Sequence, residues 1–275
     1  MRFTKMQACG NDYIYVNCFE EHVDDPAIMA VRISDRHYGV GSDGLILIEP
    51  SGKGDAFMHM FNSDGSEGTM CGNGIRCVAR YIYDHRIISE DRRHAVIDTA
   101  AGLREVDIEV ADGEVTSVTV DMGSVLSTGA GKADAGIPGG PVLFESIDIG
   151  NPHAVVFLDG NNGLGDSLEA LPLKQIGMAV ENCGLFPDGV NVEFIEVTGP
   201  GEIRMRVWER GSGETLACGT GAAASASAGC ITGRLKSPVL VHLAGGDLTI
   251  DYDTENGKCL MTGPAEYVFT GEYDV

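Results

Sequence analysis

The stretch Cys71-Gly72-Asn73-Gly74 recurs later in the chain as Cys218-Gly219-Thr220-Gly221. At the same offset, the run Leu45-Ile46-Leu47-Ile48-Glu49 matches Val192-Glu193-Phe194-Ile195-Glu196. One match between short glycine-containing words would be weak, but several in the same order indicate two halves of one architecture. The period is too long for a solenoid repeat. Residues 123–141, rich in glycine and proline, have the composition of an irregular connection between the halves.

Most of each half has the period of two that is typical of strands. Residues 203–208 alternate apolar and polar side chains, and residues 248–252 do the same. The exceptions directly follow the two cysteine motifs, where residues 74–84 and 219–232 are expected to be helices. The second of these has no charged residue, which predicts a helix buried on every side. We therefore predict an α/β fold of the α+β type, each half a mixed, mostly antiparallel sheet or barrel around a central buried helix.

Composition excludes several classes of function. The 275 residues include 41 acidic and 19 basic ones, and this net charge of -22 opposes binding to nucleic acids and to anionic membranes. No segment approaches the roughly 20 apolar residues that a membrane span requires, and the N-terminus does not resemble a secretion signal. Eight cysteines without a CxxC pair or a dense Cys/His cluster suit a reducing compartment, and they predict no metal site. We expect a cytoplasmic protein.

Each repeated cysteine lies between a glycine-rich turn and the first residues of an expected helix. The start of a helix presents unpaired N–H groups and a partial positive charge, which stabilise a thiolate and also bind a carboxylate. A single cysteine there would more often be a buried, inert side chain. Two cysteines at equivalent places in duplicated halves instead favour a disulfide or a catalytic pair.

Five longer strings resemble the diaminopimelate epimerase family. They are Gly-Asn-Asp-Tyr at 10–13, Phe-Asn-Ser-Asp-Gly-Ser-Glu at 61–67, Cys-Gly-Asn-Gly-Ile-Arg-Cys at 71–77, Gly-Asn-Pro-His at 150–153 and Trp-Glu-Arg-Gly-Ser-Gly-Glu-Thr-Leu-Ala-Cys-Gly-Thr-Gly at 208–221. The last string is highly specific, and the resemblance covers nearly the whole chain. It implies two pseudo-symmetric domains with the active site in the cleft between them. The expected domains are residues 1–122 with a returning C-terminal strand 265–275, and residues 123–264.

The resemblance also implies a reaction and a set of residues. The reaction is the epimerisation of LL- to meso-diaminopimelate, a step towards lysine and cell-wall precursors, without pyridoxal phosphate, another cofactor or a metal. Cys71 and Cys218 would be the thiolate and thiol of an acid–base pair, and His153 and Glu209 would modulate their protonation. The substrate-binding residues would be Asn11, Asn62, Gly72, Asn73, Asn151, Asn191, Glu209, Arg210, Gly219 and Thr220. The oligomeric state is left open, a homodimer included.

Two positions depart from the family pattern, and two other functions compete. Gly44 stands where many relatives have glutamine, so no side chain can contact substrate there, and Cys9 stands where an apolar residue is usual. A proline racemase also uses paired cysteines, but Asn73 and the Glu209-Arg210 pair favour diaminopimelate. A non-catalytic amino-acid-binding or redox-sensing protein, with Cys71 and Cys218 as a switchable disulfide, is the alternative from another class.

Overall fold

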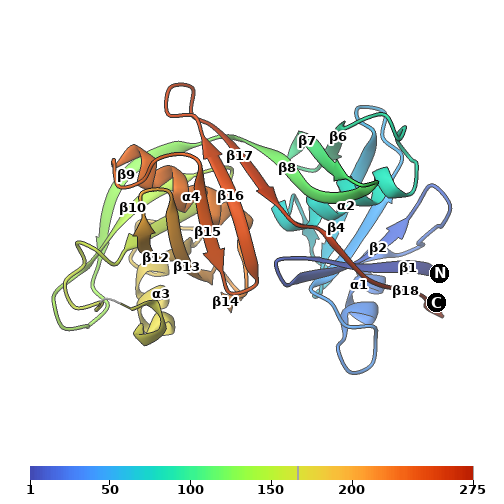
Figure 1. The fold of residues 1–275 in the computed structure, drawn as a ribbon. Coiled ribbons are helices and arrows are strands. Elements are labelled where there is room, and N and C mark those ends of the chain that lie inside the picture. Colours follow the sequence, from blue (N-terminus) through green and yellow to red (C-terminus); the bar gives the residue numbers. More distant parts are fainter. Residues whose placement is uncertain (166, 275) are drawn as a thin grey trace. The chain divides into compact units, whose positions relative to one another are not determined.

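The computed structural model describes residues 1–165 and 167–274, and the chain divides into two compact units (Figure 1). Unit 1 contains residues 1–121 and the C-terminal segment that begins at Thr262, and unit 2 contains Met122–Met261. Both units are of the mixed α+β type and consist mostly of strands. Within the described part of the chain, no helix has the length and apolar character needed to cross a membrane.

Unit 1 is a mixed sheet with two helices against it. Its elements are β1 (Arg2–Ala8), β2 (Asn11–Asn17), α1 (Pro26–Ser34), β3 (Gly44–Glu49), β4 (Ala56–Asn62), β5 (Glu67–Gly68), α2 (Gly72–Asp84), β6 (His94–Thr99), β7 (Gly102–Ala111), β8 (Glu114–Ser124) and β18 (Glu266–Glu272). Strand β1 pairs antiparallel with both β2 and β18. Strand β3 is buried almost throughout, which explains its continuous apolar sequence.

Unit 2 has a comparable set of elements. They are β9 (Leu126–Ala133), β10 (Val142–Asp148), β11 (Pro152–Phe157), the 3₁₀ turn η1 (Leu168–Ala170), α3 (Leu173–Glu181), β12 (Asn191–Gly199), β13 (Glu202–Glu209), β14 (Gly213–Thr215), α4 (Gly219–Ile231), β15 (Val239–Leu243), β16 (Gly246–Tyr252) and β17 (Lys258–Gly263). The chain enters this unit within β8 and leaves it within β17.

The two units share one order of strand pairing. In unit 1, β2 pairs parallel with β3, β3 antiparallel with β4, and β4 parallel with β6. In unit 2, β11 pairs parallel with β12, β12 antiparallel with β13, and β13 parallel with β15. The register agrees as well, because Tyr13 lies opposite Gly44 and His153 lies opposite Asn191. The predicted duplication is therefore present, with Tyr13 equivalent to His153 and Gly44 to Asn191.

The strands of each unit lie around one long helix, α2 in unit 1 and α4 in unit 2 (Figure 1). Helix α2 begins at Gly72 rather than at residue 74, and α4 ends at Ile231 rather than at 232. The prediction that α4 is buried is confirmed, since Ala222, Ala223 and Ala224 are inaccessible to solvent. Small side chains let the surrounding strands approach α4 closely on all sides, and alanine has the highest helix propensity.

Two helices, α1 and α3, lie outside the cysteine motifs, so the prediction of helices only at those motifs is wrong. Helix α1 has a recognisable start: the Asp25 carboxylate accepts a hydrogen bond from the backbone N–H of Ile28 at 3.1 Å, and Pro26 occupies the first turn. Helix α3 starts after Pro172 without a side-chain cap, and it packs Ile176 and Val180 into the core of unit 2. Tertiary packing therefore determines α3 more than any local signal does.

Candidate active site

Cys71 is the N-cap residue of α2. The turn between β5 and α2 places its sulfur over the start of the helix, where the backbone N–H of Gly74 donates a hydrogen bond to Sγ at 3.3 Å. Sγ also lies 3.3 Å from Oδ1 of Asn11, and Asn11 in turn donates to the Asp43 carboxylate at 2.7 Å. The cysteine and Asn11 are both half-buried. Asn11 is thus fixed by Asp43 in a position to contact the sulfur.

Cys218 is the N-cap residue of α4 in the same geometry. The backbone N–H of Gly221 donates to its Sγ at 3.4 Å, and Nδ2 of Asn191 approaches Sγ at 4.0 Å. Asn191 also accepts a hydrogen bond from the backbone N–H of Arg210 at 2.9 Å. Cys218 is more buried than Cys71. Burial, and then the negative charges of Glu209 and Glu193, raise the pKa of the Cys218 thiol well above its ordinary value.

Glu209 ends β13 and faces Cys218. Its carboxylate accepts a short hydrogen bond from the hydroxyl of Thr215. Burial, which outweighs this hydrogen bond, raises the pKa of Glu209, and the nearby charge of Glu193 raises it further. The arrangement puts an acidic group with a raised pKa beside a thiol, so a proton can be held close to Cys218.

His153 and Glu193 form a pair inside unit 2. His153 lies on β11 and Glu193 on the adjacent β12, and Nδ1 of the imidazole is 2.7 Å from Oε1 of the carboxylate. Both side chains are fully buried. Burying a charged carboxylate is costly unless it is paired, and the imidazole supplies a partner for Glu193.

The remaining predicted substrate-binding residues lie at the ends of the same elements. In unit 1, Asn62 ends β4 and donates to the hydroxyl of Ser66 at 2.9 Å, whereas Asn73 is buried and accepts from Nη2 of Arg76 at 2.8 Å. The side chain of Asn73 therefore braces α2, and only its backbone is available as a helix-start donor. In unit 2, Asn151 directly precedes β11, and Gly219 and Thr220 are the first residues of α4. Arg210 is exposed, and its Nη1 donates a hydrogen bond to the carbonyl oxygen of Asp188.

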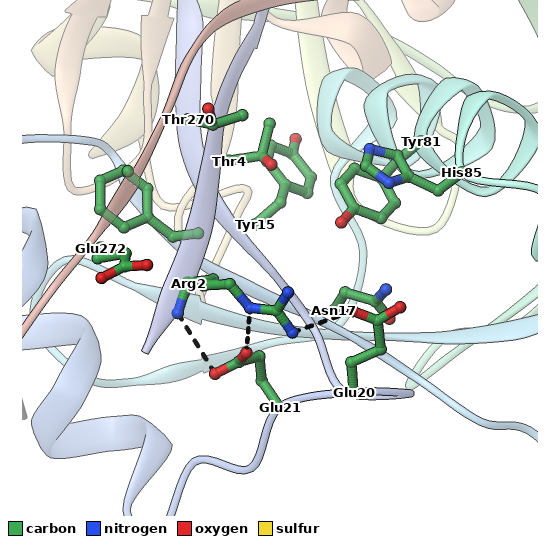
Figure 2. A pocket seen from close by; sticks show the side chains of 12 residues that line it. Arg2, Thr4, Tyr15, Asn17, Glu20, Glu21, Tyr81, His85, Thr270 and Glu272 are labelled. Carbon is green, nitrogen blue, oxygen red and sulfur yellow. Dashed lines mark hydrogen bonds and ion pairs between the residues drawn. The ribbon is translucent and has the colours of Figure 1, made fainter.

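The described residues contain no cluster of three or more His, Cys, Asp or Glu side chains arranged to hold a metal ion. A hollow of about 350 Å³ opens in unit 1 (Figure 2), and Cys71 is not among the residues that line it. Arg2 bonds Glu20 and Glu21 there, and the ring of His85 stacks on Tyr81 with centroids 3.8 Å apart. The carboxylates of Glu20 and Glu21 therefore both bind Arg2 in this hollow.

Comparison with known proteins identifies the family. The family model described as Diaminopimelate epimerase matches residues 3–127 and 145–268. This chain belongs to the diaminopimelate epimerase family. It is 45% identical to the diaminopimelate epimerase of Agathobacter rectalis over the full length of both chains, and 47% identical to that of Geobacillus kaustophilus over 98% of this chain and 96% of that one.

Solved structures with the same fold are more distant in sequence. A probable proline racemase from Agrobacterium radiobacter is 18% identical, with a TM-score of 0.73 over 100% of this chain and 93% of that one. A hydroxyproline epimerase from Agrobacterium vitis is also 18% identical, with a TM-score of 0.73 over 98% and 90% of the two chains. At 18% identity, the similarity to these two solved structures shows the fold alone. The relatives that match over the full length show that the chain is an isomerase of the epimerase type.

The two departures from the family pattern have structural settings. A Cβ atom on Gly44 would lie 2.2 Å from the carbonyl oxygen of Phe61 and 2.8 Å from the ring of Tyr13, so no side chain fits there. Cys9 is buried with a positive φ of 52°, and Nη2 of Arg76 lies 3.8 Å from its sulfur. Cys9 therefore contacts α2 through Arg76.

Glu193 is a neighbour of Cys218 and His153 that was not predicted as a site residue from sequence. The residue lies within the run 192–195, and the available signal was a carboxylate between apolar neighbours in that run. Thr215 was also missed as a site residue, although it lies within the string 208–221. The hydrogen bond from Thr215 to Glu209 depends on the antiparallel pairing of β13 with β14.

Proposed function

We propose that the chain interconverts LL- and meso-diaminopimelate without a cofactor, with Cys71 and Cys218 as a thiolate and thiol acting on opposite faces of one α-carbon. The observation that carries this proposal is the shared geometry of the two sulfurs. Each caps the central helix of its unit, and each accepts a backbone N–H from the glycine three residues ahead, at 3.3 Å for Cys71 and 3.4 Å for Cys218.

The chemistry needs one base and one acid. The thiolate removes the α-proton and becomes a thiol, while the opposite thiol gives its proton to the other face of the α-carbon and becomes a thiolate. Free cysteine has a pKa of roughly 8.5, so only a few per cent is ionised at neutral pH without help. Helix-start N–H groups lower the cost of the charged sulfur.

The same helix starts would bind the reacting end of the substrate. Negative charge develops on the α-carboxylate as the α-proton leaves, and backbone N–H groups at 72–73 and 219–220 are suited to stabilise it. The amide side chains proposed to hold the substrate are Asn11, Asn62, Asn151 and Asn191. Asn11 and Asn191 support this assignment, because each contacts the cysteine of its own unit.

Diaminopimelate carries a second amino-acid group at its far end. The guanidinium of Arg210 suits the distal carboxylate and Glu209 suits an ammonium group, since a planar fork binds a carboxylate with two parallel hydrogen bonds. Arg210 is exposed and bonded to a single backbone carbonyl, so it can exchange that contact for substrate.

The decisive experiment is an isomerisation assay with purified protein and LL-diaminopimelate, without added cofactor and with a chelator present. Appearance of meso-diaminopimelate is expected, and Cys71→Ser and Cys218→Ser should each abolish it. L-Proline serves as the control substrate and should not racemise. Binding of diaminopimelate without turnover, retained in the double serine variant, would point instead to a binding or redox-sensing protein.

A further inference from the structure

Glu193 and His153 leave two polar atoms unpaired at the centre of unit 2. Nδ1 of His153 contacts Oε1 of Glu193, but Nε2 of the imidazole and Oε2 of the carboxylate are buried with no hydrogen-bond partner among the described residues. An ionised carboxylate only accepts hydrogen bonds, so beside ionised Glu193 the proton of this contact is on Nδ1. Nε2, on the opposite side of the imidazole ring, is the buried nitrogen that this contact does not satisfy.

Unit 1 has a different pair at the same place. The register makes Ile46 the equivalent of Glu193, and the contacts with the two central helices agree. A Cβ atom built on Gly74 would meet Cδ1 of Ile46 at 2.8 Å, and one built on Gly221 would meet Oε1 of Glu193 at 2.6 Å. One scaffold position thus presents a methyl group to α2 and a carboxylate to α4.

The two cysteines consequently have unlike surroundings. Glu193 on β12 and Glu209 on β13 both act on Cys218, and the imidazole of His153 on β11 acts on Glu209 with the opposite sign. Negative charges beside a buried thiol favour its protonated form. In unit 1, Tyr13 occupies the position equivalent to His153. Burial, together with Cys71 and Asp43, raises the pKa of the Tyr13 phenol, so this side chain stays a neutral hydroxyl.

We propose, resting on the two-cysteine function above, that Glu193 is a positioning residue: it holds His153 in the Nδ1–H tautomer behind α4 and makes Cys218 the proton donor of the resting enzyme. Cys71, which has an apolar side chain and a neutral phenol at the matching positions, is then the base. The role of Glu193 is exerted through His153 and through its charge, without contact to substrate.

The test compares Glu193→Gln with Glu196→Gln, a matched change on the same strand that removes a carboxylate paired with Arg204 at 2.9 Å. Iodoacetamide alkylation of the Cys71 and Cys218 peptides is followed by mass spectrometry from pH 6 to 11 in the absence of substrate. We expect E193Q to lower the midpoint for Cys218 by roughly one unit or more while the midpoint for Cys71 stays unchanged. E196Q should move neither.

An unchanged Cys218 midpoint in folded E193Q would overturn the proposal. If E193Q does not fold, the unmodified protein still gives an answer, because nitrogen-15 NMR of the imidazoles reports the tautomer. Finding Nδ1 of His153 without a proton would overturn the positioning role. The alkylation and NMR measurements do not depend on catalytic activity. The proposed function is tested separately, by the loss of activity expected in Cys71→Ser and Cys218→Ser.

Discussion

Replacing Gly221 with alanine should be much more damaging than replacing Gly74, its equivalent in unit 1. A Cβ atom on Gly221 would lie 2.6 Å from Oε1 and 3.1 Å from Cγ of Glu193, a carboxylate held by His153. The Cβ atom of Gly74→Ala would instead meet two flexible tips, Cδ1 of Ile46 at 2.8 Å and Cε of Met58 at 2.9 Å. Those methyl groups can rotate away, whereas the carboxylate can move only by stretching its bond to the imidazole.

The magnitudes follow from these contacts. Overpacking costs about 1–3 kcal/mol, and loss of a hydrogen bond to a charged group costs about 1.5–3 kcal/mol. Replacing glycine with alanine inside a helix stabilises the folded protein by about 0.5–1 kcal/mol, because alanine has less conformational freedom in the unfolded chain. We expect Gly221→Ala to lose about 3 kcal/mol of unfolding free energy, or roughly 6–12 °C in Tm, and Gly74→Ala to change it by less than about 1 kcal/mol.

Differential scanning calorimetry of the two variants measures this difference directly. Glu193→Ala supplies the control, because removing the carboxylate also removes the collision. In that background Gly221→Ala should cost little, so the double variant should be more stable than the sum of the single changes predicts. Equal losses for Gly74→Ala and Gly221→Ala, or strict additivity with Glu193→Ala, would refute the assigned contact.

Three further predictions concern the whole site and the surface. Activity should require reducing conditions, and full activity after stoichiometric Cys71–Cys218 disulfide formation would exclude the two-cysteine mechanism. In deuterium oxide, mass spectrometry of the first few per cent of conversion should find α-deuterium in product and little in recovered substrate; equal labelling of both pools would exclude two separate bases. Molar potassium chloride should raise Tm by screening the net charge of -22, whereas a flat or falling Tm would leave that charge without an effect on stability.

The sequence predicted the duplicated fold because duplication leaves a linear signal. The two Cys-Gly motifs predicted α2 and α4, with the start of α2 placed at residue 74 instead of Gly72, and the absence of charge in 219–232 predicted the burial of α4. Helix α3 could not be predicted, since it has no capping side chain and its helical form depends on packing against β12 and β13. The catalytic and binding roles of the named residues stay predictions.

The part of the site that sequence could not supply is the part set by register. The sequence predicts a buried strand at 192–195. The contact between Glu193 and His153 arises only from the parallel pairing of β11 with β12. Likewise, the reason for glycine at 44 is the approach of the Phe61 carbonyl, which belongs to the antiparallel neighbour β4. Contacts of this kind link residues that are distant in sequence and leave no periodic pattern.

The divergence between Ile46 and Glu193 has a consequence for a pair of bases that shares one proton. Two thiols in identical surroundings would ionise equally, and half of the singly protonated enzyme would hold the proton on each sulfur. A difference of one pKa unit between them, about 1.4 kcal/mol, puts roughly ten of every eleven molecules into a single arrangement. A duplicated fold supplies two equivalent helix starts, and under the proposal above Glu193, together with Glu209 and His153, would separate the acid from the base.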